Sequence, residues 1–125
     1  MQVIDAIFDP ELGYTAFTVD RITYTRASGA TSSRSATSQA MGSIHPGSPE
    51  MMQLLPEEER TDAFIAVYTD FALSTGTDTG RSASWQAPDR IRWNGHTWRV
   101  VRVRDWSTFG YYQALAVRMR EGEDD

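Results

Sequence analysis

The sequence predicts a mainly β protein, a small antiparallel β-barrel of about five or six strands with one short helix and long loops. The first observation is a pair of β-branched and aromatic runs on either side of Asn94-Gly95, which favours the type I′ turn of a two-residue hairpin. The second is Ala63–Thr69, a continuous apolar run of strand length that is typical of a buried central strand. The third is that helical and strand patterns do not alternate along the chain, which argues against a parallel α/β sheet.

The length of 125 residues predicts one domain with a modest core. We expect an N-terminal arm over residues 1–13, a single barrel domain over residues 14–120 and an acidic tail over residues 121–125. The absence of cysteine excludes disulfides and thiolate metal sites. No apolar run reaches the roughly 18–20 residues that span a membrane, and no secretory signal is visible. The expected place of synthesis is therefore the cytoplasm, without a membrane partner.

The first half of the chain is less regular than the second. Residues 1–13 contain a short amphipathic run followed by Asp9-Pro10, which we interpret as an arm, and Tyr14–Arg26 has the composition of a strand. Ala27–Ser43 is a low-complexity segment of Ser, Thr, Ala and Gly. It is either a loop or a weak strand around Ser35–Met41, and a loop of this length suggests a segment that becomes ordered on a neighbour.

A short helix is expected after this segment. Ser48 can cap a helix over Pro49–Leu55 with proline at its first position, and Pro56 ends it. Its apolar side would cover a mouth of the barrel, and it consists of Met51, Leu54 and Leu55. The charged segment that follows, Glu57–Arg60, is interpreted as a solvated turn. Beyond the central strand, Ser74–Ala87 is a second loop rich in Gly, Thr and Ser.

The hairpin strands Asp89–Trp93 and His96–Arg104 have one apolar and one arginine face near their turn. Successive strand side chains point to opposite faces, and a two-residue turn sets which residues face each other. The apolar face carries Ile91, Trp93, Trp98 and Val100, and the other carries Arg90, Arg92 and Arg99. A turn over Asp105–Gly110 then leads to a last strand, Tyr111–Met119.

Charge is distributed unevenly along the chain. Residues 1–80 hold four arginines and eleven acids, residues 81–120 hold eight arginines and two acids, and the last five residues add four acids. All twelve basic residues are arginine. A GC-rich coding genome explains this composition, and so does a role in ion pairs at interfaces, to which the arginine fork is suited. An acidic surface beside a basic one also favours head-to-tail packing of identical subunits.

The residues that could carry catalysis are few. His45 and His96 are the two histidines, and neither has a carboxylate partner suggested by the sequence. The chain contains no nucleophile elbow, no phosphate-binding glycine loop and no metal-ligand spacing, so we expect no enzyme, no cofactor and no metal.

Arginines interleaved with Trp93, Trp98 and Trp106 resemble those of a single-stranded nucleic-acid-binding barrel. Alternation separates the two residue types near the turn, and the chain is acidic overall, so an arginine–acid contact between subunits is the simpler hypothesis.

A longer pattern carries a family resemblance. From Gly95 the chain runs through a hairpin glycine, an aromatic, alternating valines, Asp-Trp, a glycine-bearing turn, Tyr-Tyr and a strand ending in arginine. The positions are Gly95, Trp98, Val100, Val101, Val103, Asp105, Trp106, Gly110, Tyr111, Tyr112 and Arg118. With Gly42-Ser-Ile-His-Pro46, the Leu-Leu-Pro-Glu-Glu-Glu-Arg turn and the strand Phe64–Thr69, this resembles the head-closure (head–tail joining, or stopper) proteins of tailed bacteriophage necks. The resemblance covers roughly residues 14–120, and residues 1–13 depart from it.

The resemblance implies a homo-oligomeric ring, six- or twelve-fold, between the portal or its adaptor and a tail-completion or tail-tube protein. Such a ring is made in the host cytoplasm, becomes part of the virion, seals the filled capsid and lets genomic DNA pass through its lumen without sequence-specific binding. Expected contact residues are Arg90, Arg92, Arg99, Arg102, Arg104, Trp106, Tyr111 and Tyr112, with Ser32, Arg34, Thr77 and Arg81 as docking residues in the two loops. A tail-completion or tail-terminator protein is an alternative within the same class.

Overall fold

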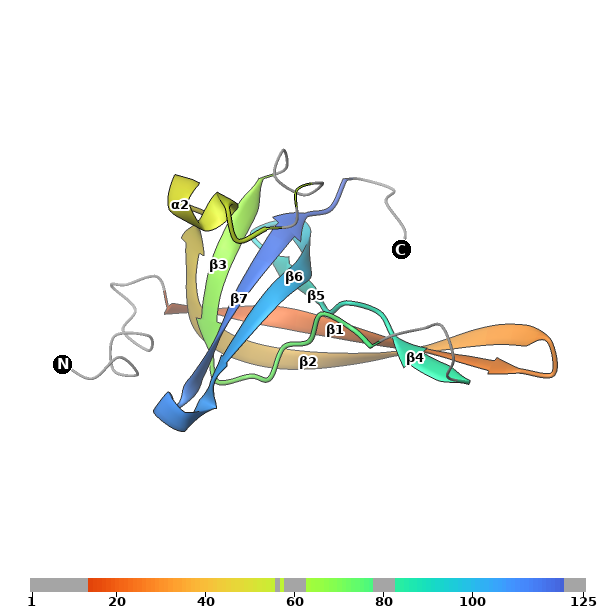
Figure 1. Ribbon diagram of the computed structural model, residues 1–125. Helices are drawn as coiled ribbons and strands as arrows, with labels where there is room; N and C mark the ends of the chain where they lie inside the picture. The colour runs from red at the N-terminus through yellow and green to blue at the C-terminus, as the bar shows by residue number, and fades with distance from the viewer. Residues whose placement is uncertain (1–13, 56, 58–62, 78–82, 121–125) are drawn as a thin grey trace.

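The computed structural model describes residues 14–55, 57, 63–77 and 83–120, and it contains one antiparallel sheet (Figure 1). Its strands are β1 (Tyr14–Ala27), β2 (Ala30–Pro46), β3 (Phe64–Thr69), β4 (Ser84–Gln86), β5 (Arg90–Trp93), β6 (His96–Trp106) and β7 (Tyr111–Arg118). The sheet order is β2-β3-β7-β6-β5-β1-β4, and β1 also pairs with β2. Six strands therefore close into a ring of hydrogen bonds, and β4 lies outside it. The prediction of a mainly β fold is confirmed.

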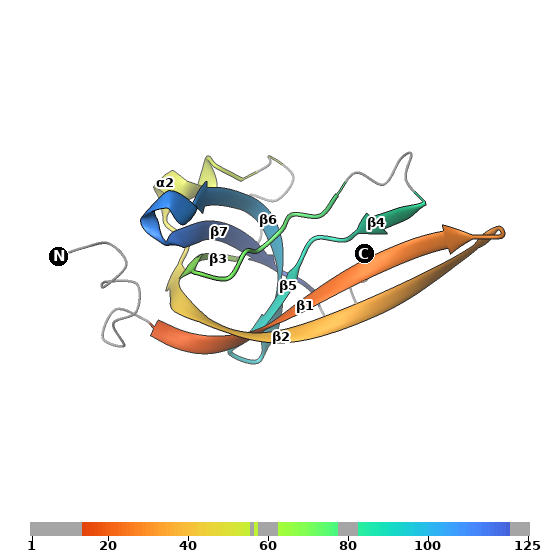
Figure 2. The same cartoon turned by 90° about the horizontal axis from the view of Figure 1, so that it is seen from below.

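The ring is not a regular barrel, because its strands differ greatly in length. β1 has 14 residues and β2 has 17, whereas β5 has four. The β1–β2 hairpin consequently projects far beyond the ring, as Figures 1 and 2 show. We call its projecting part, residues 22–38, the finger.

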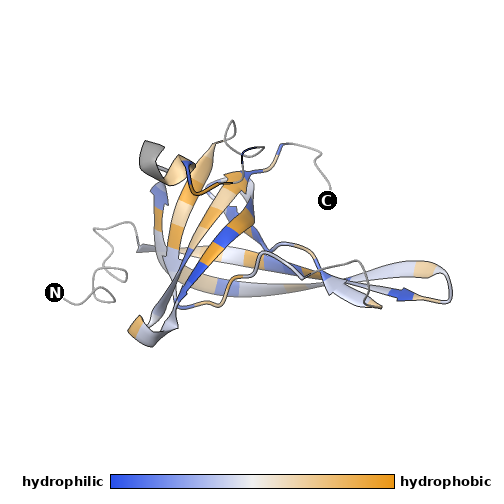
Figure 3. Ribbon diagram, in the orientation of Figure 1, coloured by the Kyte–Doolittle hydropathy of each residue, from blue (hydrophilic) through white to orange (hydrophobic). Residues whose placement is uncertain are grey.

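The interior of the ring holds the main core, to which all six ring strands contribute. It consists of Phe17, Val19, Ala40, Ile44, Ile65, Val67, Leu73, Ile91, Trp98, Val100, Ala114 and Ala116. Burying each large aliphatic side chain among these stabilises the fold by about 1.5–3 kcal/mol. Figure 3 shows the matching contrast, with β3 and β7 mostly apolar and the finger mostly polar.

The central strand β3 is buried on both faces, as its unbroken apolar run predicts. Ile65 and Val67 point into the ring, while Phe64 and Ala66 point out into a second cluster. That outer cluster consists of Leu55, Phe64, Ala66, Leu115 and Val117, packed against by Met51, Leu54, Tyr68 and Val101.

The short helix α2 (Pro49–Met52) covers this outer cluster. Ser48 caps it as predicted, its side chain accepting a hydrogen bond from the backbone N–H of Met51 at 3.3 Å. The prediction that the helix reaches Leu55 and covers a mouth of the barrel is wrong. The helix ends at Met52, and Leu54 and Leu55 pack against the outward face of β3 and β7. That face needs a cover because β3 is apolar on both sides.

Of the two alternatives for Ala27–Ser43, the loop is wrong and the strand is confirmed, because residues 30–46 form β2, which includes and extends beyond Ser35–Met41. The strand pairs with β1 from Ala27 opposite Ala30 to Tyr14 opposite Ser43. Ser28 and Gly29 have φ values of 52° and 78°, as a type I′ turn requires. The sequence predicts this strand only weakly, because both faces of the finger are in solvent. A strand of that kind has no buried face and therefore does not show alternating apolar and polar residues.

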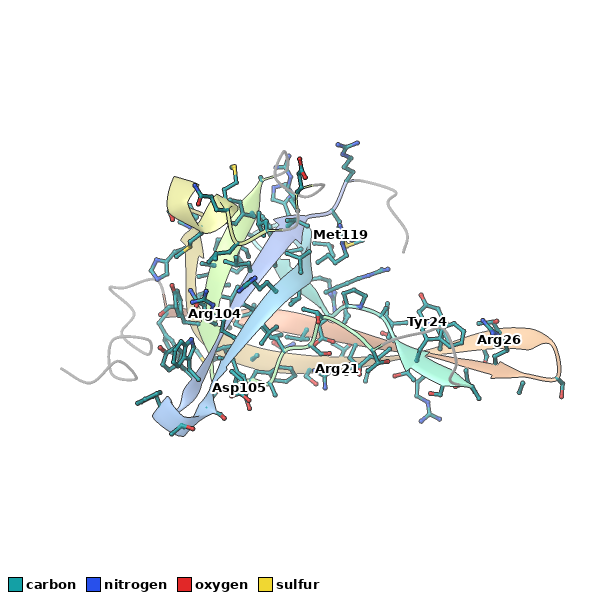
Figure 4. All side chains as sticks on the ribbon, viewed as in Figure 1. Arg21, Tyr24, Arg26, Arg104, Asp105 and Met119 are labelled. Carbon is teal, nitrogen blue, oxygen red and sulfur yellow. The ribbon has the colours of Figure 1, made fainter. Side chains whose placement is uncertain are left out.

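The second predicted loop, Ser74–Ala87, also contains a strand. β4 pairs with Thr23–Thr25 of β1. Its Trp85 stacks on Tyr24 with ring centroids 5.6 Å apart, and the Arg26 guanidinium lies 5.0 Å from the Trp85 ring centroid. These contacts fix β4 on the finger at the place where Figure 4 labels Tyr24 and Arg26.

The β5–β6 hairpin has the predicted register. Arg90 faces Arg99, Ile91 faces Trp98, Arg92 faces Thr97, and Trp93 faces His96. The apolar face is confirmed too, since Ile91, Trp98 and Val100 are buried and Trp93 packs against the same cluster.

An ion pair closes one side of the core. Asp89 is fully buried, and its carboxylate accepts hydrogen bonds from Nε of Arg21 at 3.0 Å, from Nη2 of Arg21 at 2.8 Å and from the backbone N–H of Ser74 at 2.9 Å. Arg21 also donates to the carbonyl of Ala72 at 2.8 Å. The hydrogen bond to Asp89 raises the pKa of the Arg21 guanidinium. The pair therefore joins β1, residues 72–74 and the residue that precedes β5.

Candidate interaction surface

The five arginines of β5 and β6 all lie on the outward side of the ring, although simple alternation would place only Arg90, Arg92 and Arg99 there. Arg99 points outward, opposite Val117 of the outer cluster, so strict alternation would turn Arg102 and Arg104 inward. A β-bulge between Val100 and Arg102 shifts the register by one residue. Val100 and Val103 then share the interior cluster, and Arg102 and Arg104 face solvent.

The environments of these arginines differ. Arg92 forms an ion pair with Asp20 of its own chain, with 2.8 Å between Nε and Oδ2, and Asp20 also accepts a hydrogen bond from Thr37. Arg90 and Arg99 are half-buried opposite each other. Arg102 and Arg104 are exposed, with Arg102 Nη1 3.4 Å from the Leu54 carbonyl. Arg102 and Arg104 are thus exposed arginines that form no ion pair with an acidic side chain of the described residues, unlike Arg92.

Exposed aromatic rings gather at the end of the β6–β7 hairpin. Trp106 is 38% exposed and Phe109 63%, and their ring centroids lie 6.0 Å apart. Phe109 ends the 3-10 turn η3 (Ser107–Phe109), and Gly110 leaves that turn with a φ of 91°. Two partly exposed large rings side by side at one hairpin end make this end a candidate contact surface.

Asp105 holds this turn in place. Its Oδ1 accepts a hydrogen bond from the backbone N–H of Ser107 at 2.8 Å. Hydrogen bonds from Ser107, first from its side chain and then from its backbone, lower the pKa of Asp105. Figure 4 labels Arg104 and Asp105 toward this end of the β6–β7 hairpin.

The exposed arginines and the aromatic rings form one surface, which we call the tip surface. It consists of Arg102, Arg104, Trp106, Phe109 and Tyr111. Trp106 pairs with Tyr111, and Arg104 pairs with Gln113, so these side chains share the outward face. Tyr68 extends it, with its ring 6.4 Å from that of Tyr111 and its hydroxyl accepting a hydrogen bond from Gln113 Nε2. Tyr112, opposite Thr69, points to the other face of β7.

The predicted loop-docking residues lie in separate places. Ser32 and Arg34 are exposed on the finger. Thr77 is held within its own chain, donating its N–H to the Gln86 carbonyl at 3.0 Å and accepting the Gln86 N–H on Oγ1 at 2.8 Å. Arg81 lies outside the described residues.

The two histidines contact aromatic rings. His45 lies edge-on to Tyr68, and His96 lies edge-on to Trp98. Across the ranges that the structure describes, no group of three His, Cys, Asp or Glu side chains is placed to hold a metal ion. In the same ranges, no helix has the length and apolar character needed to cross a membrane.

Sequence reasoning missed Phe109 and Tyr68 as members of the tip surface. It also missed an open groove of about 520 Å³ beside the start of β1, lined by Tyr14, Ala16, Gln39, Ala40, Met41, Asp70 and Phe71. The signal for Phe109 was available, since a large aromatic within a glycine-bearing turn has no core to enter. The groove could not be found in this way, because its walls come from three separate segments.

Comparison with known proteins adds one relative and no family. No family model matches the chain. The chain is similar to an uncharacterized protein of Xylella fastidiosa (strain 9a5c), with 30% identity over 74 residues, which is 59% of this chain and 49% of the relative. The chain thus spans about half the length of that protein.

Proposed function

We propose that the chain is a structural component of a tailed-bacteriophage neck, a head-closure protein that forms a ring between the portal or adaptor and the tail. In this role it seals the DNA-filled capsid and presents a docking surface to the tail. The chain performs no catalysis in this proposal, and its partners are copies of itself and the proteins above and below it in the neck.

The observation that supports the proposal best is the tip surface. The residues that carry the resemblance, Gly95 to Arg118, form one continuous unit of β6, η3 and β7 with the turn before them. The exposed end of this unit combines Arg, Trp, Phe and Tyr, the residue types enriched in the energetic centres of protein interfaces. A protein that works by docking needs such a surface, whereas an enzyme needs a pocket with convergent polar groups.

The test uses virions of a tailed phage whose genome encodes this chain. Antibody labelling under the electron microscope should place the protein between capsid and tail. Phe109→Ser should yield either filled heads that lack tails or heads that leak DNA, because it removes an exposed aromatic side chain that has no contact with the core. Met52→Ser, which truncates another exposed apolar side chain, is the matched control and should assemble normally. Absence of the protein from purified virions would overturn the proposal, and labelling at the tail end alone would favour a tail-completion or tail-terminator role.

A single-stranded nucleic-acid-binding role is the second candidate, favoured by one observation. The bulge places Arg102 and Arg104 on the same face as Trp106 and Tyr111, the combination of cations and stacking rings found in such binders. Titration of the full chain with a thymidine oligonucleotide separates the two. Micromolar binding that weakens steeply with added salt and is lost in Trp106→Ala would support this candidate, because counterion release governs such affinity. Binding that is undetectable at low salt would exclude it.

A further inference from the structure

The finger has an open sheet edge along β2. Residues 30–41 of β2 pair with β1 alone, and pairing with β3 begins only at Gly42. On the other side of the β1–β2 hairpin, β1 is covered by β4 at Thr23–Thr25 and by β5 at Thr18–Asp20. Within the described residues, the β2 side of the finger is thus the side without a neighbouring strand.

The register shows which backbone groups this edge presents. In an antiparallel pair, alternate residues direct N–H and C=O away from the partner strand. Ile22 C=O accepts from Ala87 and Arg26 N–H donates to Ala83, so the even-numbered residues of β1 point away from β2. Their partners on β2 are odd-numbered and must point outward in the same way. Met41 is odd-numbered too, and its backbone does point away from β1, because its carbonyl accepts a hydrogen bond from Thr69 Oγ1 at 2.7 Å.

The outward residues of β2 along this edge are Thr31, Ser33, Ser35, Thr37 and Gln39. All five are exposed, so five N–H and five C=O groups lie in a row along solvent. Proteins normally protect such edges with proline, lysine or a bulge. Residues 30–41 contain no proline and no lysine, their pairing with β1 is unbroken, and Arg34 is their single charged residue.

We propose that this edge pairs with the same edge of a second copy of the chain, antiparallel, across a two-fold axis at Ser35. Only odd-numbered residues point outward, so each pair across the contact joins an odd-numbered residue of one copy to an odd-numbered residue of the other. If residues 31–39 of both copies overlap fully, Ser35 lies opposite Ser35 of the second copy, Ser33 opposite its Thr37 and Thr31 opposite its Gln39. All ten outward groups of each edge find partners in this register. Arg34 lies opposite Ala36, so no like charges face each other.

The composition of the edge favours a second copy over an unrelated strand. Apart from Arg34 and Gln39, its side chains are no larger than threonine over residues 30–40, so it forms no pockets that could select a foreign sequence. Recognition then rests on the backbone and on small hydroxyl side chains, and Ser and Thr pair well with each other across strands. The same edge supplies a strand of matched length and polarity. The inference is independent of the proposed neck function.

A single-cysteine experiment tests the register, because the native chain has no cysteine. Ser35→Cys places two thiols in directly opposed positions with Cα atoms about 5.5 Å apart, within disulfide range. Ser32→Cys is the matched control, equally exposed on the same strand but opposed to Ser38, so its two thiols are about 20 Å apart. Mild oxidation of the full chain should cross-link Ser35→Cys about tenfold more than Ser32→Cys, since pairing raises the effective thiol concentration. Equal cross-linking of both variants, or none, overturns the proposal.

Sedimentation gives a second readout. The wild-type chain should show a reversible monomer–dimer equilibrium. Ser33→Pro should shift it to monomer, because it removes an outward N–H and leaves the ladder with β1 intact. Ser33→Thr keeps that N–H and should dimerise like wild type, and circular dichroism checks that both variants remain folded. A wild-type monomer at every accessible concentration, or a dimer that survives Ser33→Pro, overturns the inference.

Discussion

The buried carboxylate of Asp89 offers the sharpest test of the structural reasoning. Asp89→Asn preserves the shape of the side chain but replaces one acceptor oxygen with an NH₂ donor. In one orientation that donor faces Arg21 Nε, and in the other it faces both Arg21 Nη2 and the backbone N–H of Ser74, all of which donate to Asp89 in the native protein. The substitution therefore places the new NH₂ group against another N–H donor in a fully buried position, and it also removes the negative charge that compensates Arg21.

The expected cost follows from these losses. Breaking one side of a buried ion pair costs about 3–5 kcal/mol. The Arg21 side chain is 36% exposed, so water screens part of the charge, and we expect a loss of about 3 kcal/mol of unfolding free energy. For a domain of this size, such a loss lowers the Tm by about 10 °C. Arg21→Met should cost at least as much, about 3–5 kcal/mol, because it leaves the fully buried Asp89 carboxylate without a charge partner. The double variant should cost less than the sum of the two, because it leaves neither charge without its partner.

Urea unfolding followed by tryptophan fluorescence measures these values, with the denaturant slope m unchanged if only native contacts are lost. Asp20→Asn is the matched control, because Asp20 pairs with Arg92 at the surface, where Arg92 is 53% exposed. It should cost under about 1 kcal/mol. Equal costs for Asp89→Asn and Asp20→Asn, or additive effects in the double variant, would refute the reasoning.

Three further predictions concern backbone and pH. Gly95→Ala should lower stability by about 1–2 kcal/mol in urea unfolding, because φ is 77° there while the space around it is open, and Gly95→Asn should cost clearly less. Deleting Val101 removes the extra residue of the bulge but keeps Val100 and Val103 inward and Arg102 and Arg104 outward. The variant should therefore stay folded by circular dichroism and lose no more than about 3 kcal/mol in urea unfolding, through the lost contact of Val101 with the outer cluster, and loss of the fold would contradict the bulge. The contribution of Asp105 to the η3 turn should be fully present above its ordinary pKa of 3.8 and be lost as the pH falls through its lowered folded-state pKa. The amide chemical shift of Ser107 should report that transition; a transition at or above 3.8, or one left unchanged by Ser107→Ala, contradicts the assignment.

Sequence by itself determined the elements whose pattern is local. Asn94-Gly95 defines a turn, and the alternation around it assigns Ile91 and Trp98 to the core and Arg90 and Arg92 to the outside, as the register confirms. The apolar run of β3 predicted a strand buried on both faces. Ser48 and the proline after it predicted where α2 begins, because capping depends on neighbouring residues.

Tertiary structure alone decided the rest. The bulge at Val101 puts Arg102 and Arg104 on the same face as Trp106, and it depends on how β6 pairs with β7, since Arg102 lies opposite Leu115, 13 residues further along the chain. The finger is a strand because β1 pairs with it, since a Ser- and Thr-rich segment with solvent on both faces carries no apolar period. Asp89 is buried because Arg21, 68 residues away, reaches it. Each of these outcomes depends on partners distant in the chain, and a local pattern contains no information about such partners.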